Sequence, residues 1–163
     1  MKTLVIVRHA KSSWSLPGQN DFDRPLNERG KNDAPEMAKR LRKEGIRPDA
    51  FISSPARRAR KTCKAFAEEF GQKKDDIIFF DKLYQAPAPV FYEVIRECSD
   101  KYDTIAIFAH NPGITNFVNT LCDVHIDSMV TCSMFAVQAD VKSWAELEGA
   151  EREFLFYKYP REE

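Results

Sequence analysis

Two histidines and two arginines follow apolar runs of the sequence, and their types suit the handling of a phosphoryl group. Arg8 and His9 come directly after one apolar run, Arg58 shortly after a second, and His110 directly after a third. Guanidinium groups bind phosphate oxygens bidentately and keep their charge. A neutral imidazole is a nucleophile toward phosphorus, and a second one can donate to the non-bridging oxygens. Since phosphoryl transfer spreads negative charge over three equatorial oxygens, this set predicts phosphoryl chemistry.

The apolar runs predict buried strands that alternate with predicted helices. We expect strands at residues 4–7, 50–53, 77–80 and 104–109, and helices at about 32–44, 54–70, 89–98 and 114–121. The late runs 133–138 and 153–159 predict an edge hairpin. This order indicates an α/β protein, a three-layer α/β/α sandwich whose mostly parallel sheet has one antiparallel edge strand.

The predicted topology would bring the four candidate side chains together. Ligands of open α/β sheets bind at the carboxyl ends of the parallel strands. Arg8, His9, Arg58 and His110 all follow such ends, and the helices that begin near residues 54 and 113 would add N–H donors. We therefore expect one pocket that binds phosphate.

Composition excludes several other classes of function. The chain has 163 residues, which suits one domain, and Lys plus Arg equals Asp plus Glu at 25 each, so no overall basic field favours nucleic acid. Positive charge is concentrated locally at Arg57-Arg58-Arg60-Lys61, although the chain as a whole is balanced. No apolar stretch is long enough to cross a membrane. The four cysteines match neither CxxC nor zinc spacing, and no signal peptide precedes the first strand, so we expect reduced thiols in a cytoplasmic protein.

Four segments carry a resemblance to a known family. Arg8-His9-Ala10 resembles the Arg-His-Gly signature of the histidine phosphatase superfamily, which includes the phosphoglycerate mutases. The segment from Arg24 to Gly30 resembles its Arg-Pro-Leu-Thr-x-x-Gly segment, and that from Ser53 to Thr62 its Ser-Pro-x-x-Arg-Ala-x-x-Thr segment. Phe108-Ala109-His110-Asn111 resembles the strand of the second histidine.

The short length makes the chain similar to SixA-type phosphohistidine phosphatases, which lack the insertions that cap the site of larger members. The resemblance implies a single phosphoglycerate mutase-like domain over residues 1–163, with no metal and no cofactor. It implies that His9 is the nucleophile, that Arg8 and Arg58 clamp the phosphoryl group, and that His110 stabilises its oxygens. The implied phosphate-binding set is Arg8, Ser12, Arg58, His110 and Asn111. Arg57 lies one position early in the motif, so Arg58 is favoured.

The sequence departs from the family pattern at two places. Ala10 stands where Gly is familiar, and an alanine would be strained there if φ had to be positive. Larger members carry an acid after the third strand, whereas this chain has Gln85, with Asp81 a candidate only by proximity. Without a general acid an alkoxide leaves poorly. A phosphorylated imidazole is a better leaving group, which favours an N–P substrate.

Some residues leave two interpretations open. Asp21 and Asp23 would either hold Arg24 or Arg8 by ion pairs or belong to a solvated loop. Trp14 would either form a wall of the site or pack beneath its loop. His125 and its flanking aspartates have no further ligand at matched spacing, so a surface or packed histidine is favoured over a metal site.

We therefore predict a phosphatase that acts on phosphohistidine of a protein such as a phosphotransfer domain, with no nucleic acid or membrane partner. The alternatives are a small-molecule phosphomonoesterase, acting on a sugar phosphate or nucleotide, and a phosphate-binding regulatory protein with little turnover. Asp81 or Glu93 in the pocket would favour ester hydrolysis.

Overall fold

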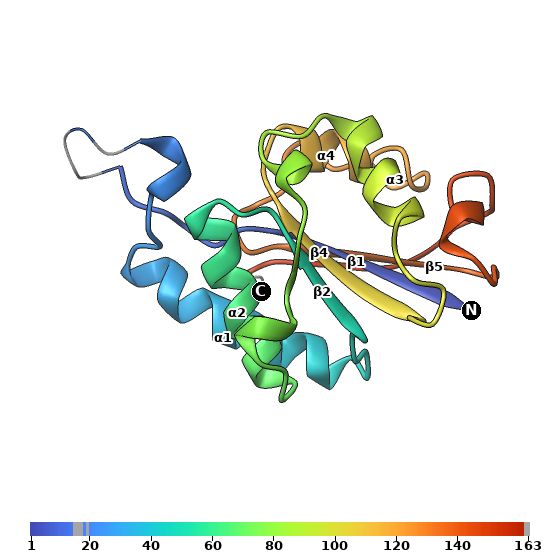
Figure 1. Ribbon diagram of the computed structural model, residues 1–163, viewed down its shortest axis with the longest axis horizontal. Helices are drawn as coiled ribbons and strands as arrows, with labels where there is room; N and C mark the ends of the chain where they lie inside the picture. The colour runs from blue at the N-terminus through green and yellow to red at the C-terminus, as the bar shows by residue number, and fades with distance from the viewer. Residues whose placement is uncertain (15–17, 19, 162–163) are drawn as a thin grey trace.

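The computed structural model describes residues 1–14, 18 and 20–161, in which strands and helices alternate (Figure 1). The strands are β1 Lys2–Arg8, β2 Ala50–Ser53, β3 Ile78–Phe79, β4 Thr104–Ala109, β5 Met134–Ala139 and β6 Glu153–Lys158. The α-helices are α1 Glu28–Lys43, α2 Arg57–Glu69, α3 Ala88–Arg96 and α4 Gly113–Val118. Short 3-10 helices occur at η1 Asp21–Asp23, η2 Lys74–Asp76, η3 Asp81–Leu83 and η4 Trp144–Glu146.

The strands form one sheet in the order β3-β2-β4-β1-β5-β6. Neighbours from β3 to β1 pair in parallel, whereas β5 is antiparallel to both β1 and β6. The predicted mostly parallel sheet with a hairpin at its edge is therefore confirmed. In this hairpin β5 is the strand that runs opposite to β1. The outermost strand, β6, runs in the same direction as β1.

Helices cover both faces of the sheet, which explains why β1 reads as an unbroken apolar run. Figure 1 shows α1 and α2 on one face and α3 and α4 on the other. Successive side chains of a strand point to opposite faces. Leu4 and Ile6 accordingly pack in the core cluster with α3 and α4, and Val5 and Val7 pack in the cluster with α1 and α2.

The pairing register places the ends of the central strands at one level. Arg8 of β1 lies opposite Ala109 of β4, and Ser53 of β2 lies opposite Phe108. The ladder continues one residue further, because the His9 N–H donates to the Ala109 carbonyl at 3.1 Å and the Ser54 N–H donates to the Phe108 carbonyl at 3.0 Å. The residues that directly follow β1, β2 and β4 are thus held next to one another at the same edge of the sheet.

Helix α1 begins at Glu28, four residues before the predicted start at 32. The Asn27 side chain accepts a hydrogen bond from the Gly30 N–H at 2.9 Å, which is a typical N-cap. The predicted start of this helix was therefore wrong, because the capping side chain lies further upstream than the apolar periodicity indicates.

Gly30 lies against the backbone of the loop that follows His9. A Cβ atom at Gly30 would come within 2.2 Å of the Lys11 carbonyl oxygen. Only glycine permits this approach, so Gly30 fixes the distance between α1 and the loop that carries Ser12.

Replacing Gly30 by alanine should destabilise the protein by about 1–3 kcal/mol through overpacking, although alanine favours a helix. Urea denaturation measures this change. Gly149→Ala is the control, because a Cβ there would meet nothing within 4 Å. Equal stability of the two variants would contradict the close approach at Gly30.

Candidate active site

A cavity of about 450 Å³ lies at the carboxyl ends of the central strands. Its lining includes every residue of the predicted site, namely Arg8, His9, Ser12, Arg58, His110 and Asn111. Lys11, Trp14, Asp21, Arg24, Gln85 and Thr131 complete the lining. The topology thus brings together side chains that the sequence separates by about a hundred residues.

The ring of His9 is buried and held in one tautomer. Its exposed fraction is 5%, and its Nδ1 lies 2.7 Å from the Ala10 carbonyl oxygen. A carbonyl oxygen only accepts, so Nδ1 carries the proton and Nε2 keeps its lone pair. Burial lowers the pKa of His9 well below the ordinary value, against the opposing effect of the Ala10 hydrogen bond. His9 is therefore neutral at neutral pH, with a nucleophilic Nε2.

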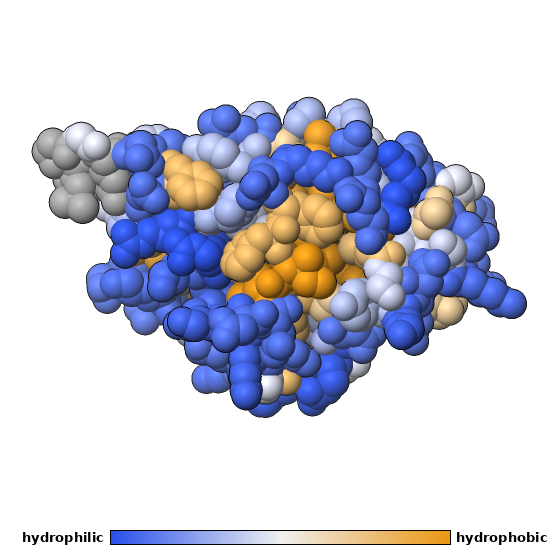
Figure 2. Space-filling model, viewed as in Figure 1, coloured by the Kyte–Doolittle hydropathy of each residue, from blue (hydrophilic) through white to orange (hydrophobic). Residues whose placement is uncertain are grey.

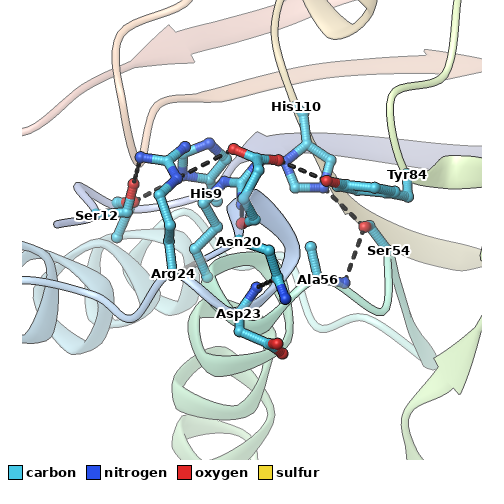
Figure 3. A network of polar contacts seen from close by, with 12 residues as sticks. His9, Ser12, Asn20, Asp23, Arg24, Ser54, Ala56, Tyr84 and His110 are labelled. Atoms are coloured by element: carbon cyan, nitrogen blue, oxygen red, sulfur yellow. Dashed lines mark hydrogen bonds and ion pairs between the residues drawn. The ribbon is translucent and has the colours of Figure 1, made fainter. Parts of the chain in front are cut away.

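His110 faces His9 across the cavity (Figure 3). The two ring centroids lie 5.2 Å apart. The Nε2 atom of His110 lies 2.7 Å from the Ser54 hydroxyl oxygen, which also accepts from the Ala56 N–H at 3.2 Å. Burial and, next, the charge of Arg58 lower the pKa of His110 to about 3. The second imidazole is therefore also neutral and is oriented by Ser54.

Several buried polar atoms of the pocket have no hydrogen-bond partner within the protein. In the part of the chain that the structure describes, the buried side-chain N and O atoms without a partner are Arg8 Nε, Arg58 Nε, His110 Nδ1 and Ser133 Oγ. Since buried polar groups are almost always paired, such atoms call for an explanation. Arg8 and Arg58 both line the cavity, and two guanidinium groups at one cavity fit an oxyanion of the phosphate type.

Asp21 contacts several donors of the pocket at once. Its Oδ2 accepts from Arg58 Nη2 at 3.0 Å and from the Tyr84 hydroxyl at 2.6 Å, and its Oδ1 accepts from Arg24 Nε at 3.1 Å. Arg58 Nη1 also donates to the Asp21 backbone carbonyl at 2.6 Å. Burial opposes ionisation of this carboxyl, but Tyr84 and the arginines outweigh it and lower its pKa to about 2. Asp21 is therefore an ionised carboxylate inside the predicted phosphate site.

Arg24 connects the loop after His9 to this network (Figure 3). It is buried and donates from Nη1 to the Ser12 hydroxyl at 2.9 Å. Its guanidinium carbon also lies 3.5 Å from the centroid of the Trp14 ring, which is 76% exposed. Of the two interpretations left open for Trp14, the structure favours a wall of the site. Of the two interpretations left open for Asp21, the structure shows the ion pair with Arg24, whereas Arg8 instead donates to the Met129 carbonyl at 2.7 Å.

The amide of Asn111 is already engaged at the rim. It donates to the Ser128 hydroxyl at 3.0 Å and accepts from the Thr115 hydroxyl. Asn111 thus lines the cavity while it holds the loop that follows α4, and phosphate binding by Asn111 stays a prediction.

Ala10 fits the position that glycine occupies in the familiar signature. Among the described residues, non-glycine positions with positive φ are Gln85, Cys132 and Arg161. Ala10 is fully buried and donates its N–H to the Thr62 hydroxyl at 2.9 Å. The strain that a positive φ would bring is therefore absent at Ala10.

The structure separates the candidate acids from the site. Asp81 and Glu93 are exposed and do not belong to the cavity lining, whereas Gln85 does. Asp21 is the carboxylate that lines the cavity within the described residues. Arg57 is exposed and lies outside this lining, so the choice of Arg58 over Arg57 agrees with the geometry.

Tyr84 and Ser54 were missed by the sequence analysis. Ser54 lies inside the segment that resembles the family motif, so its position after β2 was an available signal. Tyr84 contacts Asp21 across 63 positions of the chain. No local pattern indicates such a contact.

No group of three or more metal-ligating side chains lies close enough together to hold a metal ion within residues 1–14, 18 and 20–161. His125 is exposed, with Nε2 at 3.2 Å from Asp127 Oδ1. All four cysteines are free thiols. No helix in the described ranges is long and apolar enough to cross a membrane.

Comparison with known sequences identifies the family. The sequence model of the histidine phosphatase superfamily (branch 1) matches residues 4–83. A chloroplastic protein of Arabidopsis thaliana, itself uncharacterised, is 31% identical over 153 residues, which cover 89% of this chain and 70% of that protein. The chain belongs to the histidine phosphatase superfamily. A 2,3-bisphosphoglycerate-dependent phosphoglycerate mutase of Bartonella tribocorum is 35% identical over 81 residues, which cover 47% of this chain but 38% of the mutase.

Solved structures of the superfamily have the same fold along nearly the whole chain. A protein assigned as SixA from Agrobacterium tumefaciens superposes with a TM-score of 0.81 at 24% identity, covering 98% of each chain. The protein histidine phosphatase SixA complexed with tungstate superposes with a TM-score of 0.79 at 19% identity, covering 97% of each chain. The phosphoglycerate mutase-like fold expected for this chain is confirmed.

The lowered pKa values predict that His9 and His110 stay neutral in the folded protein between about pH 5.5 and 8. NMR titration of the ring signals should show no ionisation in this range. In urea both rings should titrate near the ordinary value of about 6.5, so stability should fall as pH drops below that value. A ring that titrates near 6.5 in the folded protein would contradict the assigned environment.

Proposed function

We propose that this protein is a phosphohistidine phosphatase that works through a covalent phospho-His9 intermediate. The observation that carries the proposal is that a neutral His9, with its Nε2 lone pair free of the Ala10 hydrogen bond, lines one cavity together with the guanidinium groups of Arg8 and Arg58. Membership of the histidine phosphatase superfamily supports it. We propose one catalytic domain over residues 1–163, working in the cytoplasm, where its free thiols would stay reduced.

The reaction would proceed in two displacements. The lone pair of His9 Nε2 attacks phosphorus in line with the leaving nitrogen, and a new N–P bond forms. The substrate N–P bond breaks with its electron pair on the leaving nitrogen, and the group leaves as neutral imidazole because its other ring nitrogen carries a proton. Arg8, Arg58 and His110 stabilise the charge on the equatorial oxygens. Water then attacks phospho-His9, the N–P bond breaks, and inorganic phosphate and free His9 are regenerated.

The carboxylate lining the cavity supports an N–P substrate over an ester. Departure of an alkoxide needs a proton donor near the leaving oxygen. Asp21, with a pKa of about 2, carries no proton to donate at neutral pH, and Gln85 cannot act as an acid. An imidazole that leaves from phosphohistidine needs less help, so the existing residues suffice.

A basic surface on helix α2, the helix that begins with Arg57 and Arg58, supports a protein-borne substrate. We call it the α2 basic surface, and it consists of Arg57, Arg60, Lys61, Lys64 and Lys74. The last four line a groove with Asp75, Ile77 and Phe79, so that four cations face one carboxylate there. Burial, followed by the charges of the other cations, lowers the pKa of Lys61. Figure 2 shows hydrophilic side chains over the α1 and α2 layer on this face. An acidic protein surface next to the phosphohistidine would relieve this crowding of cations.

The alternative is a small-molecule phosphomonoesterase. It is favoured by the likeness to a phosphoglycerate mutase over 81 residues, because that enzyme's name describes a small phosphorylated metabolite. This alternative requires an acid at the leaving oxygen, and the carboxyl group of the described lining, Asp21, is ionised.

A paired rate measurement tests the proposal. Purified protein should remove phosphate from a phosphohistidine peptide much faster than from p-nitrophenyl phosphate, and His9→Ala should lower the first rate by more than about 10³-fold. Faster ester hydrolysis would favour the phosphomonoesterase. Oxyanion binding without turnover of either substrate would indicate a phosphate-binding regulatory protein.

The α2 basic surface predicts a selective change in KM. Lys61→Glu should raise KM for a phosphohistidine peptide with acidic flanking residues several-fold, while kcat/KM for the small compound phosphoramidate stays unchanged. Lys142→Glu makes the same charge change at an exposed position outside this surface and should alter neither value. Equal effects of the two variants would contradict docking on this surface.

A further inference from the structure

We propose that Asp21 is an internal anion, which holds the phosphoryl-binding donors in the free protein and is displaced when a phosphoryl group enters. This inference rests on the proposed function for the identity of the site. It assigns to Asp21 control over which anions bind and how tightly they bind.

Asp21 uses the donors that a bound phosphoryl group would need. Both terminal nitrogens of Arg58 are directed to Asp21, Nη1 to the backbone carbonyl at 2.6 Å and Nη2 to Oδ2 at 3.0 Å. Bidentate binding of an oxyanion by Arg58 requires two adjacent N–H groups. Its Nε has no partner, whereas Nη2 is engaged by the carboxylate, so a phosphoryl group can bind the pair of Nε and Nη2 only after the carboxylate leaves, while Nη1 stays on the backbone carbonyl.

The surroundings of the carboxylate resemble those of a bound oxyanion. Oδ2 also accepts from the Tyr84 hydroxyl at 2.6 Å, and Oδ1 accepts from Arg24 Nε at 3.1 Å. The Tyr84 ring in turn packs edge-on against His110, with 5.7 Å between the ring centroids. Two guanidinium groups and a hydroxyl therefore converge on one carboxylate next to a histidine of the site. A phosphoryl group carries more negative charge and a third terminal oxygen, so it should compete successfully for these donors.

The carboxylate, rather than the guanidinium, is the group able to move. The Arg58 side chain is 5% exposed and begins on the first turn of α2, where packing fixes it. The Asp21 side chain is 35% exposed and belongs to the three-residue helix η1. Rotation of Asp21 towards water restores its hydration, whereas withdrawal of Arg58 would leave a buried cation without a counter-ion.

The need to displace Asp21 lowers the apparent affinity for every anion. Suppose that a ligand binds only the conformation in which the carboxylate is withdrawn. Its apparent dissociation constant then equals the intrinsic constant divided by the fraction of molecules in that conformation. Phosphate, which leaves as the product, is then released more readily because Asp21 returns to Arg58. A competing hypothesis makes Asp21 a positioning residue that keeps Arg58 in place. The two hypotheses predict opposite signs for the effect of removing the charge.

The test is calorimetric titration of the full-length protein with tungstate and, separately, with inorganic phosphate. Asp21→Asn keeps the size of the side chain but removes its charge, so it should tighten binding of both oxyanions about tenfold relative to the unaltered protein. Asp23→Asn is the matched control, since it removes the same charge two residues away on the same short helix, outside the cavity lining. It should change affinity less than twofold.

Weaker or unchanged binding in Asp21→Asn would overturn the proposal, and weaker binding would assign Asp21 to the positioning of Arg58. A tightening of equal size in both variants would also overturn it, because a general change of charge would then suffice. The asparagine of Asp21→Asn could still accept a hydrogen bond from Arg58. Asp21→Ala removes this acceptor, and its titration with the same two oxyanions should also show tighter binding. The titrations need no turnover, so a protein that binds tungstate without hydrolysing phosphohistidine would refute the proposed function and leave the Asp21 comparison valid.

Discussion

Buried positive charge at the carboxyl edge of the sheet is the constraint on which the rest of the site depends. Arg24 and Arg58 are buried, and Arg8 lies beside them in the same cavity. Desolvation and mutual repulsion disfavour such an arrangement, and both effects lower the pKa of Arg8 and of Arg24. The same field helps to keep His110 neutral and holds Asp21 ionised. A site built this way favours anions, and its histidines are available as a nucleophile and a hydrogen-bond donor.

The sheet makes this concentration of charge possible because it is rigid and covered on both sides. Side chains from β1 enter both core clusters, so the strand cannot shift without disturbing the packing on two faces. The register between β1 and β4 pairs Arg8 with Ala109, so the backbone positions of His9 and His110, which follow them, are fixed next to each other. Gly30 and Ser54 refine the placement, the first by close approach to the loop after His9 and the second by a hydrogen bond to His110.

Much of this arrangement could be predicted from the sequence because it depends on local signals. Unbroken apolar runs mark strands that are buried on both faces, and the residues directly after them fall at one edge of a parallel sheet. That reasoning is sufficient to bring Arg8, His9, Arg58 and His110 into one cavity. The family resemblance alone raises the question whether Ala10 is strained where glycine is familiar. Ala10 does not have a positive φ, so its backbone carries no such strain.

The unpredicted part consists of contacts between distant segments. For Asp21 the sequence leaves open an ion pair with Arg24 or Arg8 or a place in a solvated loop, whereas its bond to Arg58 spans 37 positions and its bond to Tyr84 spans 63. Side chains of such separation meet only because η1 lies against α2 and the chain after β3 returns to the cavity. The resemblance to larger family members predicts an acid near residue 81, after the third strand. Among the described residues, the carboxylate that lines the cavity is instead Asp21, which belongs to η1 in the segment before α1.

The central claim is that the phosphoryl group is transferred to His9 before it reaches water. The most direct measurement is rapid quenching of the reaction with a phosphohistidine peptide into alkali, where phosphohistidine is stable, followed by mass-spectrometric mapping of the protein. The account predicts phosphate on His9, formed before free phosphate appears and absent from His9→Ala. Phosphate on His110 or on no residue during rapid turnover would contradict it.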